Sequence, residues 1–502
     1  ITVFILFKLW LAGFLAYVCA RGLTLAPGYA RFFSIAYMLC GYMVTWCSYT
    51  TVDSMGWAPI LFLGTEYLIA GRLLRGYATC LVSSSMMVLA AGAQHTLTFS
   101  LLLGFYFVTR LACMRSATHA ARAIAVAVAA AGTSLLVTAI QVFPFLETMS
   151  LSLTSLDCFF NSNAADYHYS PYDAPALWSP WYFGTYLHGN FWGNINPFFL
   201  MAGYIGIPCW IGASLAFRVD GILRLRVSCL LLASLLALWQ AFDGLGAALI
   251  MYLPGFSGVR PCYFMSFFVF ALPLIAAISL ESWYCDAARA RRIWPALAVS
   301  ALIVCVTGVH LVLSQSSLTE LNGVMERTGS LVAQLIGPAL PLRAQDGTLN
   351  EFVQRQVIWT VAISVLSIAC LLAVRVKRLP PSSGIATLTG VLVIDLWAAW
   401  SGMQPTSNRK NVFPNVPVFQ SMQEKGHPNR INFDAIAIDG LPIPYGLEEL
   451  QGYDAMVPER FWRTYEAVCP RMGKLRSRAP RQRLSTSTRP PPRVNQRSPK
   501  NS

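Results

Sequence analysis

Residues 71–122 read GRLLRGYATCLVSSSMMVLAAGAQHTLTFSLLLGFYFVTRLACMRSATHAAR, and this stretch sets the fold of the chain. Two apolar runs, 77–93 and 97–113, are each close to the roughly 20 residues that a helix needs to cross a bilayer. Arginines flank this pair of runs, whereas the connection between the runs, around Gln94 and His95, is uncharged. Because short cytoplasmic loops are enriched in Lys and Arg, this order predicts two spans joined on the outer side.

The same alternation continues in both directions along the chain, so a polytopic all-α membrane protein is expected. Hydrophobic residues make up 55% of the sequence and charged residues 12%, and the mean hydropathy is +0.52, a profile far from that of a soluble globular protein. The basic connections hold Arg21 and Arg31; Arg72 and Arg75; Arg110, Arg115 and Arg122; Arg218, Arg224 and Arg226; Arg289, Arg291 and Arg292; and Arg375, Lys377 and Arg378. About twelve spans are predicted, at about 1–20, 32–49, 57–71, 77–93, 97–113, 121–145, 197–217, 227–253, 262–280, 294–313, 357–374 and 385–402.

The net charge of +14 comes mostly from the last residues. Ten of these positive charges lie between Pro470 and Ser502, which contain no acid, so the rest of the chain carries only +4 and gives no reason to expect a nucleic-acid partner. This Arg/Pro/Ser-rich tail, 469–502, cannot build a core and is expected to be disordered. Because the topology places it outside, where a polybasic tail has no leaflet to attract it, a frameshifted reading of the gene is favoured.

The apolar runs and their connections divide the chain into five parts. The first membrane block, 1–145, is followed by an aromatic extracytoplasmic loop, 146–196, which has no basic residue. The second membrane block, 197–403, includes an outer loop, 315–356, in which an amphipathic helix is expected. An extracytoplasmic α/β or β-rich domain is predicted to begin within 404–468, because strand-like alternation there is punctuated by Gly and Pro.

Burying an ionisable group inside an apolar span costs free energy, so each such residue is a candidate for a functional role. The alternative is a structural role, as a buried, hydrogen-bonded or interfacial group. Lys8, Glu66, Asp243, Asp395 and Glu281 are such groups, and Glu66 is spaced to pair with Arg72 inside the bundle. The thirteen cysteines show no disulfide or metal-ligand spacing, and no metal site is predicted.

Arg260 is the strongest single candidate for a functional residue. It is the only basic residue in its predicted outer loop, LPGFSGVRPCYF (253–264), against the charge rule. An arginine there could hold a phosphate bidentately. The alternative is an ion pair with an outer acid or a lipid headgroup.

Several stretches together resemble the bacterial YfhO family of membrane proteins. They are IQVFPFLE (140–147), WYFGTYLHGN (181–190), GYIGIP (203–208), LPGFSGVRPCYFMSFFVFALPLIAAISLE (253–281), VIDLW (393–397), NRINF (429–433) and YGLEELQGYDAMVPERF (445–461). The resemblance covers nearly all of 1–468 and is specific in combination. One departure is Tyr263, where YfhO-type loops often carry a second basic residue. The resemblance also implies that a span and a large outer loop precede Ile1, and that the outer domain continues beyond Val468.

YfhO proteins resemble GT-C glycosyltransferases, so the resemblance implies a multi-pass enzyme of the bacterial cytoplasmic membrane with an extracytoplasmic C-terminal domain. The implied donor is a polyprenyl-phosphate sugar, and the implied acceptor is a cell-surface glycopolymer such as lipoteichoic acid, or a lipid. No cofactor or divalent metal is specified, and the membrane lipids are the other expected partners. A GT-C catalytic acid is expected in the first outer loop, which the resemblance places before Ile1.

On physical grounds, Arg260 is the candidate phosphate contact. Glu147 and Asp157 are secondary candidates for the catalytic acid, and Tyr182, His188 and Trp192 are candidate sugar contacts. A lipid-linked-sugar transporter or flippase, and a non-catalytic membrane scaffold, remain as alternatives. Paired inverted repeats and Gly/Pro-broken helices would favour transport; no repeat is evident, and the large outer loops favour the enzyme.

Overall fold

A computed structural model describes the two membrane blocks. The described residues are 2–151 except 91 and 115, 168–184, 191–242 except 192, 194 and 220, 259–285, 293–315, 348–401, 417, 420 and 421. Helices make up most of these residues, and these ranges contain no strand. The predicted outer domain at 404–468, the tail at 469–502 and most of the loop at 315–356 lie outside the described residues.

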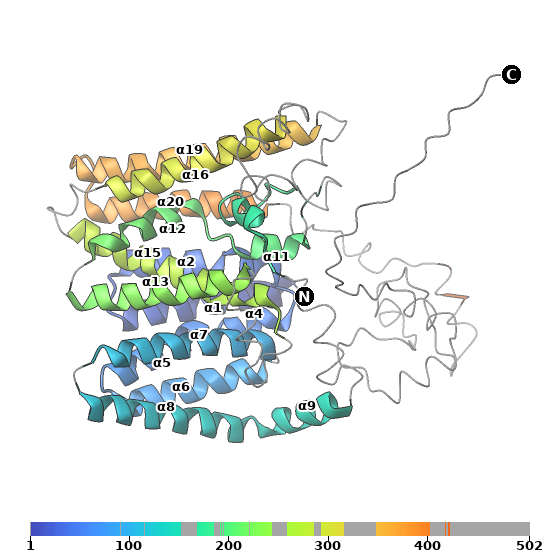
Figure 1. The fold of residues 1–502 in the computed structure, drawn as a ribbon, viewed down its shortest axis with the longest axis vertical. Helices are drawn as coiled ribbons and strands as arrows, with labels where there is room; N and C mark the ends of the chain where they lie inside the picture. Colours follow the sequence, from blue (N-terminus) through green and yellow to red (C-terminus); the bar gives the residue numbers. More distant parts are fainter. Residues whose placement is uncertain are drawn as a thin grey trace, which may run out of the picture.

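The helices lie side by side and roughly parallel to one another (Figure 1). The first block contains α1 (Thr2–Gly22), α2 (Pro27–Met38), α3 (Gly41–Thr45), α4 (Thr50–Met55), α5 (Ala58–Ile69), α6 (Leu73–Leu89), α7 (Ala93–Ala112), α8 (Ala117–Val137) and α9 (Ala139–Leu151). The 3-10 helix η1 (Pro171–Leu177) follows. The second block contains α11 (Pro197–Ala202), α12 (Ile207–Ser214), η3 (Leu215–Arg218), α13 (Gly221–Ala241), η4 (Pro261–Phe264), α15 (Met265–Cys285), α16 (Trp294–Gln315), α19 (Thr348–Arg375) and α20 (Pro381–Trp400).

Six segments of the described chain are long and apolar enough to cross a membrane. They are Val3–Gly22, Ala117–Val137, Leu223–Ala241, Pro261–Tyr284, Gln354–Arg375 and Pro381–Trp400. The prediction of an all-α membrane protein is therefore confirmed at this level, whereas the count of about twelve spans stays a prediction.

Two predicted spans are divided into short helices. The run 32–49 is split between α2 and α3, and the run 197–217 is split among α11, α12 and η3. Gly206, with a φ of 86°, stands between α11 and α12 in a conformation that residues with a Cβ rarely adopt.

The core of the molecule surrounds α15. In its segment, Pro261–Tyr284, 94% of the most apolar window is buried, compared with 17% in the segment that forms α8. Helices α2, α7, α12 and α13 all pack against α15. A helix that is apolar on every side is expected at such a central position, whereas α8 leaves an apolar face exposed at the edge of the bundle.

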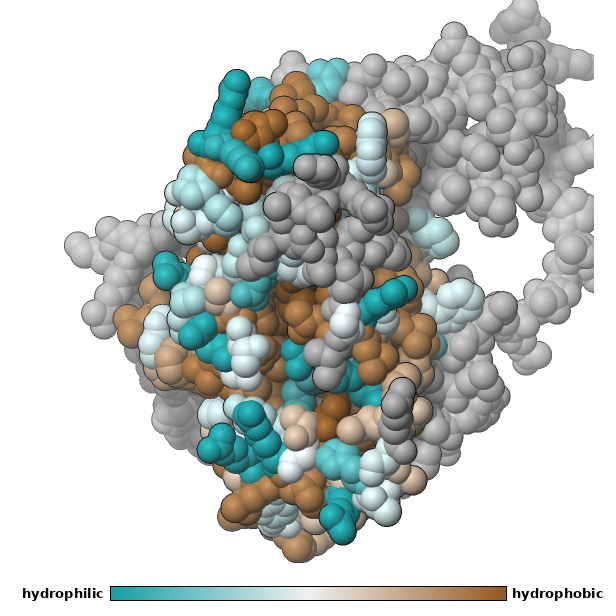
Figure 2. Space-filling view, turned by 90° about the vertical axis from the view of Figure 1, so that its left-hand side faces the viewer, coloured by the Kyte–Doolittle hydropathy of each residue, from teal (hydrophilic) through white to brown (hydrophobic). Residues whose placement is uncertain are grey.

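The arginine-bearing connections meet at one end of the bundle, here called the arginine end. It lies at the left in Figure 1, and Figure 2, which looks onto it, shows hydrophilic side chains scattered among apolar ones. Arg72 precedes α6, Arg110 lies near the end of α7, and Arg224 lies near the start of α13. The connections predicted to lie outside meet at the opposite end, where α4, the start of α7 and α11 are found.

Candidate functional site

Five side chains at the end opposite the arginine end form a polar and aromatic group, here called the His95 cluster: Tyr42, Thr51, His95, Arg260 and Tyr263. The buried His95 ring is hydrogen-bonded through Nδ1 to the Tyr42 hydroxyl and through Nε2 to Thr51 Oγ1, at 3.0 Å for the second bond. The Tyr263 ring lies edge-on to it, with centroids 4.2 Å apart. Arg260 Nη1 is 3.5 Å from the Tyr263 hydroxyl. The positive charge of Arg260 also interacts electrostatically with the imidazole of His95.

The sequence around Arg260 explains how this side chain is positioned. Arg260 precedes Pro261, which disfavours helical dihedrals, and its backbone is extended, with φ −68° and ψ 130°. The 3-10 turn of η4 then begins at once, closed by a hydrogen bond from Tyr263 N to Arg260 O at 3.0 Å. Thr98 Oγ1 donates to the carbonyl oxygens of His95 and Tyr263, at 3.0 and 3.4 Å, so α7 and η4 are held together.

Tyr42 is positioned by a close backbone contact of α3. Gly41 N donates to Tyr204 O at 2.6 Å. A Cβ at Gly41 would lie 1.8 Å from the carbonyl oxygen of Met201, so only glycine fits without a backbone shift. The second membrane block therefore fixes a residue of the first block that hydrogen-bonds His95.

The cluster combines one half-buried cation, Arg260, with several hydroxyl groups and aromatic faces of buried residues. A guanidinium is a strong partner for phosphate oxygens, and hydroxyls can donate to the same group. Both ring nitrogens of His95 are engaged, so its place in this arrangement is to orient Tyr42 and Thr51. Among the described residues, no group of three His, Cys, Asp or Glu side chains could hold a metal ion.

The six residues singled out from the sequence are not brought to one place by the described structure. Arg260 lies in the His95 cluster. Tyr182 is buried beside Phe183, with ring centroids 5.1 Å apart, and its backbone N–H donates to Ser179 O. Glu147 is exposed on α9. Asp157, His188 and Trp192 lie outside the described residues.

Sequence reasoning did not select Tyr42, Thr51 or Tyr263. One signal for them was available: Thr51, His95 and Arg260 each belong to a different connection that the charge rule places outside. Connections on one side of a bundle can converge, but the sequence does not say which of their side chains will meet.

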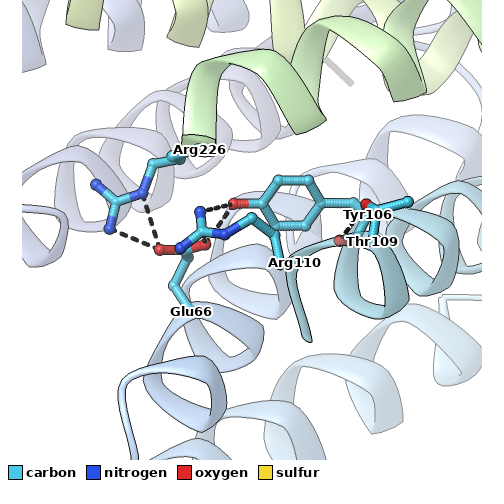
Figure 3. A network of polar contacts seen from close by, with 5 residues as sticks. All are labelled: Glu66, Tyr106, Thr109, Arg110 and Arg226. Atoms are coloured by element: carbon cyan, nitrogen blue, oxygen red, sulfur yellow. Dashed lines mark hydrogen bonds and ion pairs between the residues drawn. The ribbon is translucent and has the colours of Figure 1, made fainter. Parts of the chain in front are cut away.

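A second polar network, here called the Glu66 cluster, lies near the arginine end (Figure 3). Glu66 Oε2 accepts from Arg226 Nε at 2.8 Å and lies 2.6 Å from Arg226 Nη2. Glu66 Oε1 accepts from Arg110 Nη1 at 3.2 Å and from the Tyr106 hydroxyl. Arg226 approaches the carboxylate from the side opposite Arg110 and Tyr106. The expected partner Arg72 is replaced by arginines of α7 and α13, so this cluster joins three helices.

A second buried acid, Asp395, links α20 to α19 and to the segment at the start of α12. Asp395 is fully buried and accepts hydrogen bonds from the Tyr204 hydroxyl at 2.6 Å, from Ile207 N at 2.8 Å and from Trp359 Nε1 at 3.2 Å. Glu281 accepts from Ala26 N at 2.9 Å, just before α2. These contacts indicate that Asp395 and Glu281 have a structural rather than a functional role. Asp243 lies outside the described residues.

Comparison of the chain with protein-family models, with curated proteins and with solved structures finds no match. The assignment of a function therefore depends on the residues of the site and on the resemblance argued from the sequence.

Proposed function

We propose that this chain is a YfhO-like integral membrane protein that acts as a GT-C-type glycosyltransferase. It would move a sugar from a polyprenyl-phosphate donor to a cell-surface glycopolymer or lipid, on the outer face of a bacterial cytoplasmic membrane. The observation that carries the proposal is the half-buried Arg260, held beside Tyr263 and His95 at the end of the bundle opposite the arginine end.

The chemistry of sugar transfer calls for such a cation. As the bond between sugar and phosphate breaks, negative charge builds up on the departing lipid phosphate, and a positioned guanidinium stabilises that charge. The acceptor hydroxyl also needs a general base. Glu147 and Asp157, the two acids of the predicted outer segment that follows the first membrane block, are the candidates for this base.

The direct test is binding of a polyprenyl phosphate to the full chain in lipid nanodiscs. Arg260→Gln keeps a polar side chain of similar length and removes the charge. We expect it to raise the Kd about 30-fold, which corresponds to about 2 kcal/mol, the scale of a charge-assisted hydrogen bond. Arg224→Gln is the matched control, because Arg224 is exposed at the arginine end. Equal affinity in the wild type and Arg260→Gln would refute the phosphate role.

One observation favours a second candidate, a lipid-linked-sugar flippase. Two predicted spans are broken into short helices, α2 with α3 and α11 with α12, and interrupted helices are frequent in transporters. Sealed vesicles containing the full chain and a fluorescent polyprenyl-phosphate sugar separate the two functions. Sugar transfer to an added acceptor without lipid movement supports the enzyme, and lipid movement without transfer supports the flippase. If the chain shows neither activity, the non-catalytic membrane scaffold is the remaining alternative.

A further inference from the structure

A cavity separate from the His95 cluster lies between α1, α4 and α6. Its volume is about 220 Å³, and its lining is mainly apolar, with Phe4 and Phe7 on α1, Met86 and Leu89 on α6, and Trp57 just after α4. Phe4, Phe7, Met86 and Leu89 are also exposed on the surface of the molecule, so the cavity opens outward between two helices. Of the helices that form it, α1 is one of the six able to cross a membrane.

One ion pair lies in the wall of this apolar cavity. Lys8 Nζ donates to Asp53 Oδ2 at 2.8 Å, and the side chains are 9% and 28% exposed. A lysine ammonium has three donor hydrogens and an aspartate has two acceptor oxygens. Within the described part of the chain, their hydrogen bond engages one hydrogen of Lys8 and one oxygen of Asp53, and Lys8 also lies over the Phe4 ring, 4.5 Å from its centroid. Both charges therefore keep capacity for a further partner.

The position of the pair along α1 suits the polar boundary of a bilayer. Lys8 lies six residues after the start of α1, which is about 9 Å along the helix axis, at the end of the bundle opposite the arginine end. Long lysine side chains near helix ends extend toward the membrane interface. On the outward face of α1, the rings of Phe7, Trp10 and Phe14 follow one another, with Trp10 and Phe14 stacked at 5.5 Å. Such an exposed apolar face packs favourably against the acyl chains of membrane lipids.

We propose that this cavity binds one phospholipid whose headgroup carries both a phosphate and a primary amine. The phosphate would accept hydrogen bonds from Lys8, and the amine would donate to Asp53, so each charge of the pair meets an opposite charge of the headgroup. One acyl chain would lie against Phe7, Met86 and Leu89. Charge complementarity selects this class over anionic lipids, because with a headgroup that has a phosphate and no amine, two negative groups, the phosphate and Asp53, would share the single cation of Lys8.

Trp57 supplies a local probe of the cavity. The full chain is reconstituted in vesicles containing a small, equal fraction of bromine-labelled phosphatidylethanolamine or phosphatidylglycerol, since bromine on the acyl chain quenches nearby tryptophan. The difference in fluorescence between the wild type and Trp57→Phe isolates the Trp57 signal. We expect phosphatidylethanolamine to quench this signal at least threefold more strongly than phosphatidylglycerol.

The double variant Lys8→Gln, Asp53→Asn tests the role of the ion pair. It removes both charges together and leaves no unpaired buried charge, so the fold should persist; Arg378→Gln, at the arginine end, is the control. In the double variant, we expect both lipids to quench the Trp57 signal equally. In the control, phosphatidylethanolamine should still quench it at least threefold more strongly than phosphatidylglycerol. Equal quenching in the wild type, preference retained in the double variant, or no quenching of Trp57 by either lipid would each overturn the proposal. These outcomes are independent of polyprenyl-phosphate binding at Arg260.

Discussion

Asp173 belongs to the 3-10 helix η1, outside the membrane-spanning segments, and its side chain is almost completely buried. Asp173 Oδ2 accepts a hydrogen bond from Ser170 N at 2.7 Å, whereas Oδ1 is buried without a hydrogen-bond partner in the described structure. Burial away from water disfavours the charged carboxylate and raises the pKa of Asp173 from 3.8 to about 6, although the bond from Ser170 opposes this change.

This raised pKa predicts a specific pH dependence of stability. The folded protein holds the Asp173 proton more tightly than the unfolded chain, so the stabilising contribution is complete below about pH 4 and is lost as the pH rises through 6. The shift of about two pKa units corresponds to about 3 kcal/mol at most. We expect Asp173→Asn to remove this component from the unfolding free energy measured between pH 4 and pH 7. An unchanged pH profile in the variant would show that Asp173 is not the responsible group.

Single residues also show what the sequence could and could not predict about the sites. The presence of Glu66 in an apolar run was enough to expect a buried ion pair, but its partners, Arg110 and Arg226, are 44 and 160 positions away in the sequence. Local spacing instead suggested Arg72. Arg260 could be selected because it breaks the charge rule. Thr51 shares with it only a connection predicted to lie outside, and Tyr42 has no sequence feature that links it to Arg260. Long-range packing decides such partners.

At the level of elements, the short helix α3 is held by the close approach of Gly41 to the end of α11. Gly41→Ala would bring a methyl group into the carbonyl oxygen of Met201, at 1.8 Å in the unrelaxed structure. We expect the variant to lose about 1–3 kcal/mol of unfolding free energy, the usual cost of overpacking. It should also weaken the hydrogen bond between Tyr42 and His95, because Tyr42 directly follows the displaced residue.

Gly104→Ala is the matched control for this prediction. Gly104 lies inside α7 with no other atom within 4 Å of its would-be Cβ, so alanine should stabilise α7 by about 0.5–1 kcal/mol. Thermal unfolding of both variants in the same detergent compares them directly. Similar melting temperatures for the two variants would show that the contact between Gly41 and Met201 is not restrictive.

The broken helices were beyond the reach of hydropathy alone. The runs 32–49 and 197–217 are apolar throughout, which is the property that a span prediction measures. The structure turns the chain at Leu39 and Cys40, and again at Gly206, and satisfies the released backbone groups with partners far away in sequence, such as Tyr204 and Asp395. Non-helical backbone is tolerated inside a membrane protein where other protein groups satisfy it.

For the whole molecule, the alternation of basic and non-basic connections was the most informative sequence feature. It required neighbouring helices to run in opposite directions, and the described helices do bring the arginine-bearing connections to one end. The sequence could therefore predict a helical bundle and the end of the bundle at which the described connections lie. It could not predict the central position of α15, because several other runs are similarly apolar.

A matched pair of positions on α20 tests which end faces the cytoplasm. Ser382 and Ser401 are both exposed, and they lie at the start and just after the end of this 20-residue helix, which is about 30 Å long. The charge rule puts the Ser382 end, near Arg378, in the cytoplasm. With the native cysteines replaced, an impermeant maleimide should label Ser401→Cys in intact cells and Ser382→Cys only after permeabilisation. The reverse pattern would invert the topology and remove Arg260 from the outer face, and labelling of both positions in intact cells would mean that α20 does not cross the membrane.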